Sequence, residues 1–299
     1  MTLATLEQPP TASPVALGGA DKGRLVIDSV TKFYETTGVP VLQNISLTCQ
    51  PGEFVVVVGP SGCGKTTLLN LAAGMIRPDQ GTISLDGKPI TAPGPERAMV
   101  FQEHGLFSWL TAAQNVDFGL KMAGFPKSER KDRVAEALKM VHLSHIAKKY
   151  PHQLSGGMRQ RVSIARALVI QPAVLLMDEP FAALDAQTRF HLHEELQELW
   201  LKTHKTILFI THSIAEAVRL ADRVVVMHAH PGRIRNEIKV TLSHPRKSHS
   251  DDVAHIVRIV RREIEEEVNR VNAQLADEFR PRPAADDLDD DSGDLGGGI

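Results

Sequence analysis

The run GPSGCGKTT, residues 59–67, restricts what this chain can fold into more than any other feature of the sequence. It fits the pattern G-x-x-x-x-G-K-[S/T] and lies between the apolar run FVVVV and a predicted helix. In that context the glycines let the backbone wrap a phosphate, the Lys65 ammonium reaches the outer phosphates of a nucleotide, and the Thr66 hydroxyl ligates Mg²⁺. The pattern predicts a strand, a phosphate-binding loop and a helix in succession, with the candidate ligand residues Gly59, Pro60, Ser61, Gly62, Cys63, Gly64, Lys65, Thr66 and Thr67.

Short apolar runs predict the sheet on which this loop sits. FVVVV (54–58), VLLM (174–177), ILFI (207–210) and VVVM (224–227) are continuously apolar, which is typical of parallel strands buried on both faces. Helical patterns follow the first three, so βαβ units are expected. Residues 24–49 alternate more and predict antiparallel strands, whereas residues 103–160 show helical spacing and no strong strand. The predicted fold class is α/β: a P-loop NTPase core with a parallel sheet, an antiparallel β subdomain and an inserted α-helical subdomain.

Composition excludes several classes of protein. The formal net charge is −2, and the absence of a basic excess argues against nucleic acid as the main partner. Cys49 and Cys63 lie in unrelated segments, which fits a reducing cytosol rather than a disulfide framework. The N-terminal residues lack the basic start and apolar core of a signal peptide. No apolar run approaches the roughly 20 residues that cross a bilayer, so a partner would have to hold this protein at a membrane.

Polar residues follow the other predicted strands, at the edge of a parallel sheet where ligands bind. In LLMDEP, we expect Asp178 to hold Mg²⁺ through water and Glu179 to polarise an attacking water. His212 follows ILFI, and in this context a γ-phosphate sensor is favoured over a structural histidine. Gln102 follows a short apolar strand; it is either a helix cap or surface residue, or a contact to the Mg²⁺ and the attacking water.

Three residues near the loop have competing interpretations. Tyr34 precedes the phosphate loop and is the kind of aromatic residue that stacks on a base, although its neighbour Phe33 competes for that role. Cys63 lies inside the loop and contributes mainly its backbone, so we interpret it as a tolerated small residue rather than a redox switch.

A second candidate anion site lies far along the chain, in LSGGMRQRVSIARAL, residues 154–168. Here Ser155, Gly156 and Gly157 open a predicted helix whose first N–H groups suit a phosphate. One chain therefore carries two phosphate-binding patterns, and a single nucleotide does not explain both.

Five motifs stand in a fixed order: GPSGCGKTT, the glutamine of VFQ, LSGGMRQ, LLMDEP and ITH. In this order they resemble the ATPase subunit of an ATP-binding-cassette (ABC) transporter, over roughly residues 24–240. The resemblance implies a head-to-tail homodimer in which each ATP lies between the phosphate loop of one chain and the signature helix, LSGG, of the other. It also implies residue roles: catalysis by Glu179, His212, Gln102 and Lys65; Mg²⁺ binding by Thr66, Gln102 and Asp178; ATP binding by Tyr34 and the loop; and contacts to the partner's ATP by Ser155, Gly156, Gly157, Gln160 and Asp185.

Residues 94–120 and DEPFAALDAQTR are similar to importer ATPases of the nitrate, taurine and alkanesulfonate group. That resemblance implies an integral membrane permease, a periplasmic or lipid-anchored substrate-binding protein, no nucleic acid, and a place on the cytoplasmic face of the inner membrane. The segment 102–114 would take a coupling helix of the permease into a groove. Phe107, Trp109 and Leu110 are either core residues or the apolar patch that faces the permease. The alternatives are a soluble cassette ATPase acting on a ribosome or nucleic acid, a non-catalytic nucleotide-gated scaffold, and an exporter cassette.

The expected domain organisation has four parts. Residues 1–22 form a disordered N-terminal segment, 23–245 the ABC ATPase domain with its helical insertion at about 103–160, 246–279 a C-terminal helical extension, and 280–299 an acidic disordered tail. The extension has an apolar stripe of Ile256, Val260, Ile264, Val268, Val271 and Leu275. Docking of this stripe onto the domain is favoured over a dimerisation helix or a membrane-surface helix.

Overall fold

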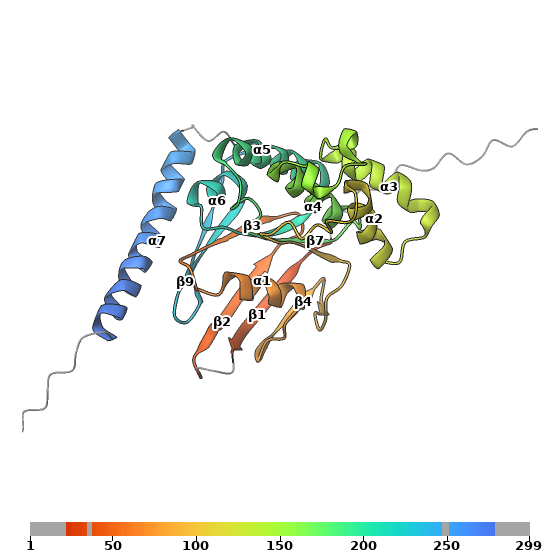
Figure 1. Ribbon diagram of the computed structural model, residues 1–299. Helices are drawn as coiled ribbons and strands as arrows, with labels where there is room; N and C mark the ends of the chain where they lie inside the picture. Colours follow the sequence, from red (N-terminus) through yellow and green to blue (C-terminus); the bar gives the residue numbers. More distant parts are fainter. Residues whose placement is uncertain (1–21, 35–37, 247–250, 279–299) are drawn as a thin grey trace, which may run out of the picture.

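Two β-sheets form the centre of the molecule in the computed structural model, which describes residues 22–34, 38–246 and 251–278 (Figure 1). One sheet has six strands in the order β10-β9-β3-β8-β7-β6, and the other has four in the order β2-β1-β4-β5. The strands are β1 (Leu25–Phe33), β2 (Pro40–Cys49), β3 (Phe54–Val58), β4 (Gln80–Leu85), β5 (Lys88–Pro89), β6 (Arg97–Val100), β7 (Val174–Asp178), β8 (Thr206–Ile210), β9 (Arg223–His228) and β10 (Arg233–Lys239).

The six-stranded sheet is parallel except for β10, which pairs antiparallel with β9. All five residues of β3 are buried, because successive side chains enter two different cores. Phe54, Val56 and Val58 pack among the helices of one face. Val55 and Val57 face the opposite core, which contains the apolar residues of β1, β2 and the first helix. The continuous apolar run of the sequence is therefore a strand covered on both sides, and the predicted α/β fold class is confirmed.

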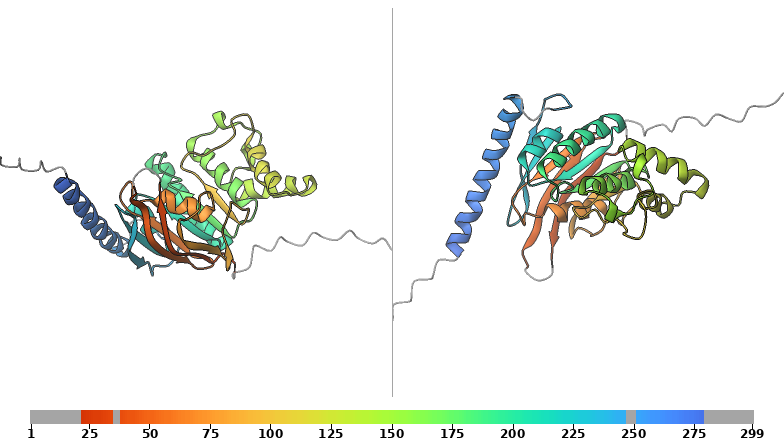
Figure 2. Two further views of the ribbon diagram at one scale, coloured as in Figure 1. Left: turned by 90° about the horizontal axis from the view of Figure 1, so that it is seen from below. Right: turned by 45° about the horizontal axis from the view of Figure 1, so that its top comes forward.

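The helices cover the parallel sheet and form a lobe beside it (Figures 1 and 2). They are α1 (Lys65–Ala73), α2 (Ala112–Met122), α3 (Lys127–Met140), α4 (Gly156–Leu168), α5 (Ala186–Thr203), α6 (Ile214–Leu220) and α7 (Asp251–Glu278), with short 3₁₀ helices at Ser144–Ile146 and Pro151–Gln153. The lobe of α2, α3 and α4 is inserted between β6 and β7, as the helical spacing predicts. Helix α4 continues to Leu168, beyond the expected end of the insertion at residue 160.

The described part of residues 24–49 contains β1 and β2, which pair antiparallel as their alternating pattern predicts. Strand β1 also pairs antiparallel with β4, so β1 is an inner strand of the smaller sheet and β2 forms one of its edges. The two sheets touch where Leu42 of β2 forms a bridge with Gly232, in the turn between β9 and β10.

Helix α7 lies along β9 and against α6 (Figure 2). Val260 is fully buried, and Ile256 and Ile264 pack against the core, so the described part of the apolar stripe docks onto the domain. The side chains of Val268, Val271 and Leu275 lie outside the described residues. The expected disorder of residues 1–22 and 280–299 likewise falls on segments that the structure does not describe, apart from Lys22. Within the described ranges, no helix combines the length and the hydrophobicity that a membrane span requires.

Candidate nucleotide-binding site

Four neighbouring parallel strands bring the predicted site residues to one edge of the sheet. Strands β3, β8, β7 and β6 lie side by side, so their carboxyl ends point in the same direction. The phosphate loop follows β3, His212 follows β8, Asp178 ends β7 with Glu179 directly after it, and Gln102 follows β6. Ligands of open α/β sheets bind at this edge. The strand order therefore brings together side chains that are far apart in the sequence. Lys65 and Asp178, for example, are separated by more than a hundred residues.

The phosphate loop has the backbone that its glycines permit. Gly62 and Gly64 have φ angles of 79° and 92°, a region that L-residues rarely adopt. A Cβ on Gly64 would stand 2.5 Å from Leu42 Cδ2, so this position also lacks room for a side chain. No side chain caps the start of α1, which leaves its first N–H groups directed at the loop. These groups and the helix dipole favour an anion at this point.

Lys65 folds over the loop that it follows. Its Nζ donates hydrogen bonds to the carbonyl oxygens of Gly59 at 2.9 Å and Pro60 at 3.0 Å, and its side chain is buried. The ammonium therefore lies inside the loop, where it can turn from these carbonyls to a bound phosphate. Cys63 is also buried, and burial raises the pKa of its thiol although Lys65 opposes the shift. A neutral buried thiol fits the interpretation of Cys63 as a small loop residue.

Two of the predicted Mg²⁺ ligands face each other. The Thr66 hydroxyl donates to Asp178 Oδ1 at 3.4 Å, across the gap between β3 and β7. Burial raises the pKa of Asp178, and the neighbouring Glu179 raises it further, although Thr66 and Lys65 oppose the shift. A hydroxyl and a carboxylate are hard oxygen ligands that suit Mg²⁺, which takes its remaining ligands from nucleotide phosphates and water. Among the residues that the structure describes, no group of three or more acidic, histidine or cysteine side chains is placed so that it could hold a metal ion by itself.

Glu179 and His212 form a hydrogen-bonded pair. His212 Nδ1 lies 2.8 Å from Glu179 Oε2, and most of the histidine side chain is exposed to solvent. The backbone of Glu179 has a φ of 42°, and its N–H donates to the carbonyl of Ile210 at the end of β8. A non-glycine residue held in this region of φ/ψ space is strained, and such strain occurs often at functional sites. The predicted catalytic carboxylate and the predicted sensor thus contact each other.

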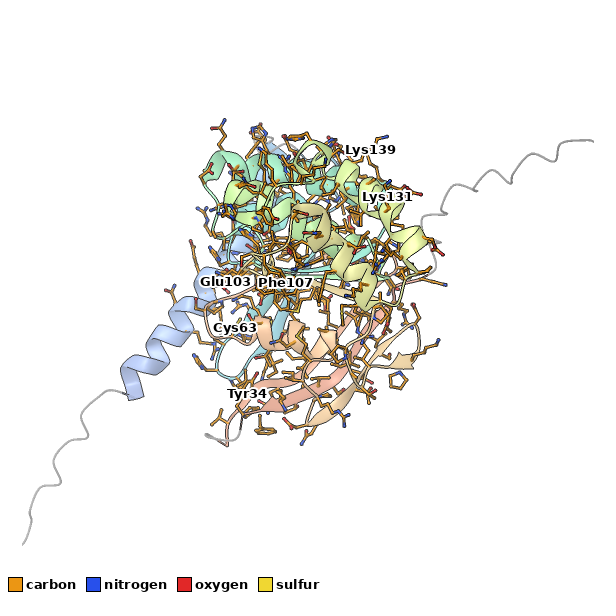
Figure 3. The ribbon with its side chains drawn as sticks, turned by 45° about the vertical axis from the view of Figure 1, so that its right-hand side comes forward. Tyr34, Cys63, Glu103, Phe107, Lys131 and Lys139 are labelled. Atoms are coloured by element: carbon orange, nitrogen blue, oxygen red, sulfur yellow. The ribbon has the colours of Figure 1, made fainter. Side chains whose placement is uncertain are left out.

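Tyr34 is the aromatic residue beside the phosphate loop. Its hydroxyl lies 3.4 Å from Thr67 Oγ1 at the start of α1, and its side chain is 45 % exposed. Phe33, the competing candidate, is half-buried within β1, where its N–H donates to Asp79. In Figure 3, Tyr34 lies on the antiparallel sheet, Cys63 lies nearer the middle of the molecule, and Glu103 and Phe107 lie beyond it toward the helical lobe. The exposed ring of Tyr34 is therefore the better candidate to stack on a base.

The second phosphate-binding pattern lies at the start of α4. Ser155 caps the helix and accepts a hydrogen bond from the N–H of Met158, and Gly156 follows it. Gly157 packs against α5, because a Cβ there would stand 2.7 Å from Thr188 Cγ2. Ser155 and Gly157 border an open groove of about 520 Å³ whose other residues come from α4 and α5, and no phosphate-loop residue lines it. The two candidate anion sites of one chain are thus separate.

Asp185 and Gln160 differ in how they fit the expected role at a partner's ATP. The exposed carboxylate of Asp185 caps α5 by accepting a hydrogen bond from the N–H of Thr188, which lowers its pKa. Gln160 is fully buried and its Oε1 is hydrogen-bonded to His104 Nδ1, so its side chain does not reach the surface that holds Ser155. Gln102 is exposed, beside this same segment.

Sequence reasoning missed the groups that hold the segment after Gln102. Arg166 of α4 donates to the carbonyl of Gly105 at 2.7 Å and to that of His104 at 3.2 Å. Asn115 of α2 is fully buried, and its side-chain amide both donates to and accepts from the backbone of Phe107. An arginine in an amphipathic helix and an asparagine one turn after a helix start gave no signal that distinguishes them from surface residues.

Known proteins resemble this chain over most of its length. A family model described as ABC transporter matches residues 42–182. The nitrate import ATP-binding protein NrtD of Synechocystis is 50% identical over 204 residues, which cover 68% of this chain and 77% of the relative. The taurine import ATP-binding protein TauB of Chromobacterium violaceum is 46% identical over 234 residues, covering 78% and 89%. The aliphatic sulfonates import ATP-binding protein SsuB of Bacillus cereus is 44% identical over 241 residues, covering 80% and 95%.

Among solved structures, a dimeric ATP-binding cassette bound to ADP and Pi matches with a TM-score of 0.64 and 33% identity, over 73% of this chain and 100% of that chain. The fold and the site define an ATP-binding cassette of the P-loop class. The chain belongs to the ABC transporter family of ATP-binding proteins, and it is an ATP hydrolase. The predicted similarity to the nitrate, taurine and sulfonate group is confirmed.

Proposed function

We propose that this chain is the ATP-hydrolysing subunit of an importer for a small anionic solute of the nitrate, sulfonate or taurine type. The relatives named for nitrate, taurine and aliphatic sulfonate import support this solute class. A separate permease and, indirectly, a periplasmic or lipid-anchored substrate-binding protein would select the solute, and the permease would hold this chain at the cytoplasmic face of the inner membrane. Nucleic acid is not a partner in this proposal. The ATPase domain spans 23–245, and residues 246–279 form its helical extension.

The separation of the two phosphate-binding surfaces is the observation that carries the proposal. Lys65 and its loop lie at the sheet edge, whereas the groove at Ser155 is lined by α4 and α5. A head-to-tail homodimer would let Ser155, Gly156 and Gly157 of one chain bind the γ-phosphate of the ATP held by the other. The exposed carboxylate of Asp185 would cross to the partner in the same interface. ATP would then join the two chains, and its hydrolysis would release them.

The roles of the edge residues follow from their contacts. Lys65 would exchange the carbonyl oxygens of Gly59 and Pro60 for the β- and γ-phosphates, and Tyr34 would stack on the adenine. Mg²⁺ bound through Thr66, Asp178 and Gln102 would neutralise the charge that develops on the transferred phosphoryl group.

Glu179 would orient or deprotonate the water that attacks the γ-phosphate in line. His212, which is 2.8 Å from the carboxylate, would keep Glu179 in place and contact the γ-phosphate. Gln102 would also contact the attacking water, and its segment leads directly to the surface that faces the permease.

An apolar groove beside Gln102 supports the permease contact. It has a volume of about 380 Å³ and is lined by Phe101, Phe107, Phe118, Met122 and Ile170, among others. Trp109 next to this groove is 71 % exposed, which is unusual for so large an apolar side chain. A short helix of the permease would bury these side chains, and dimer closure would then move the attached permease.

Replacing Glu179 with glutamine tests the catalytic part of the proposal. Glu179→Gln keeps the size of the side chain but removes the base, so we expect ATP turnover to fall at least about a hundredfold. The variant should also accumulate as an ATP-bound dimer, which size-exclusion chromatography with MgATP measures. Turnover equal to that of the wild type would contradict the assigned role.

Isolation of the chain from gently solubilised membranes tests the transport part. A tagged chain should copurify with a protein of several membrane spans, and a tagged Phe107→Asp variant should recover less of it. Recovery only in the soluble fraction, bound to ribosomes or nucleic acid, would contradict the importer proposal and leave the ATPase chemistry unchanged.

A further inference from the structure

Helix α7 holds both backbone polar groups of a single residue, Ala229, at the end of β9. Glu267 of α7 accepts a hydrogen bond from the Ala229 N–H at 2.9 Å. Arg270, one turn further along α7, donates to the Ala229 carbonyl at 2.9 Å. Because the N–H and the carbonyl are held from the same helix, the backbone at Ala229 is fixed in both position and orientation.

The contact is buried and charged. Glu267 is fully buried, and Arg270 donates to its Oε1 at 2.6 Å. His228 Nδ1 and Arg235 also contact the Glu267 carboxylate. A buried carboxylate that keeps its charge needs such a set of donors, and losing one partner of such a set is costly. These contacts of Glu267 can therefore form together only when α7 is docked in this one position.

The residues that follow Ala229 pack directly on the phosphate loop. We call residues 229–232 the β9–β10 turn. A Cβ on Gly232, its last residue, would stand 2.2 Å from the carbonyl oxygen of Cys63, so the two backbones are in close contact. Met227, two residues before the turn, lies against Gly59 of the loop in the same way. A Cβ on Gly59 would stand 3.0 Å from the carbonyl oxygen of Met227.

The turn is also joined to the strand that supports the loop. The Gly232 N–H donates to the Val41 carbonyl, and the Gln43 N–H donates to the Gly232 carbonyl, each at 2.9 Å. Leu42 between them packs against Gly64 of the phosphate loop. A shift of the turn would therefore press on the loop from both sides, since neither glycine position leaves free space.

We propose that Glu267 and Arg270 are positioning residues for ATP binding, which act through the β9–β10 turn on the phosphate loop. With α7 docked, the turn holds the loop in the conformation that accepts phosphate. With α7 displaced, the β9–β10 turn no longer packs firmly against the phosphate loop, and ATP affinity falls. The C-terminal helix thus couples its own docking to the ATP affinity of this chain.

Affinity measurements on the full-length chain test this inference. Glu267→Gln replaces one carboxylate oxygen, which accepts a hydrogen bond from Arg270 or from the Ala229 N–H, with an amide NH₂ group that can only donate. Arg270→Gln removes the hydrogen bond to the Ala229 carbonyl. For both variants we expect ATP binding to weaken about fivefold to tenfold, the range expected for coupling between neighbouring sites, as measured with a fluorescent ATP analogue. In basal ATPase assays the KM for ATP should rise to a similar degree while kcat stays within about twofold of the wild type. The matched control is Glu265→Gln, the same change at an exposed position of α7, which should leave affinity and KM unchanged.

Amide hydrogen exchange distinguishes an effect of Arg270 on the phosphate loop from a purely structural role of Arg270 within α7. It also keeps the inference testable if the Glu267→Gln variant folds poorly. In Arg270→Gln, without nucleotide, we expect faster exchange in α7, in the β9–β10 turn and in residues 59–64. Faster exchange confined to α7, or unchanged ATP affinity in both variants, would overturn the inference. A loss of kcat at unchanged KM would overturn it as well.

The inference depends on the proposed role of the phosphate loop in binding ATP, and Lys65→Ala tests that role separately. Wild-type affinity in Lys65→Ala would refute the assigned loop. Lost affinity in Lys65→Ala together with unchanged affinity in the α7 variants would refute only the coupling.

Discussion

Arg246, in the segment between β10 and α7, should be among the most costly polar side chains to remove. Its guanidinium donates to four carbonyl oxygens, those of Val218, Ala221, Val240 and Leu242, and the residue is 4 % exposed. Val218 lies in the last turn of α6 and Ala221 is its C-cap, at the end where a helix leaves its carbonyls without partners. The side chain therefore joins the end of α6 to the chain that leads into α7.

The expected loss follows from this geometry. Arg246→Met keeps most of the side-chain volume but leaves the four carbonyls without their donor. At about 1 kcal/mol for each buried carbonyl, the free energy of unfolding should fall by about 4 kcal/mol. For a domain of this size that loss lowers the Tm by about 8 °C or more.

Thermal and urea unfolding of the purified chain measure this loss. Arg258→Met is the matched control, since Arg258 is exposed on α7 and should tolerate the same change with a Tm within about 1 °C of the wild type. A Tm for Arg246→Met within about 2 °C of the wild type would refute the reasoning, because it would mean that water satisfies all the carbonyls without cost.

Three other perturbations test the site and its surroundings. Gly64→Ala puts a Cβ 2.5 Å from Leu42 Cδ2 and should weaken ATP binding at least about tenfold by titration; unchanged affinity would contradict the packing argument. Asp178→Asn removes the carboxylate that faces Thr66, so half-maximal turnover should need about tenfold more Mg²⁺, and an unchanged Mg²⁺ requirement would exclude this ligand. Burial opposes ionisation of Glu267, but hydrogen bonds from Arg270, Ala229 and His228 lower its pKa to about 2. A carboxyl group whose pKa is lowered by folding stabilises the folded state at pH values above its pKa in the unfolded chain. The unfolding free energy lost in Glu267→Gln should therefore be largest above about pH 4.5 and should shrink as the pH falls toward 2. Urea titrations at several pH values measure this loss, and a loss that does not change with pH would show that ionisation of Glu267 contributes nothing.

The fold was largely predictable because its signals are local. FVVVV can be continuously apolar only where both faces of a strand are covered, and the glycines of the adjoining loop mark the turn into α1. Parallel strands end at one edge, so the proximity of Glu179 and His212 followed from the strands alone. Their hydrogen bond did not, because it depends on the left-handed backbone of Glu179, which no residue preference predicts for glutamate.

The placement of Gln160 and the burial of Glu267, which the sequence analysis did not address, both have geometric reasons. Gln160 lies five residues after Ser155, a rotation of about 140° around a helix, so the two side chains face different sides of α4. Glu267 lies three residues after Ile264 and seven after Val260, which places it on the apolar stripe of α7. A charge at such a position signals a buried partner, but its partners His228 and Ala229 lie too far along the chain for the sequence to name them.

The backbone of Glu179 implies that stability and activity conflict at one position. A glutamate with a φ of 42° costs the fold free energy that a glycine would not, since glycine adopts this conformation freely. Glycine at position 179 would therefore make a more stable protein without the carboxylate that contacts His212. With glutamate at this position, part of the chain's stability is given up for a carboxylate beside His212, where the proposed function places the group that acts on the attacking water.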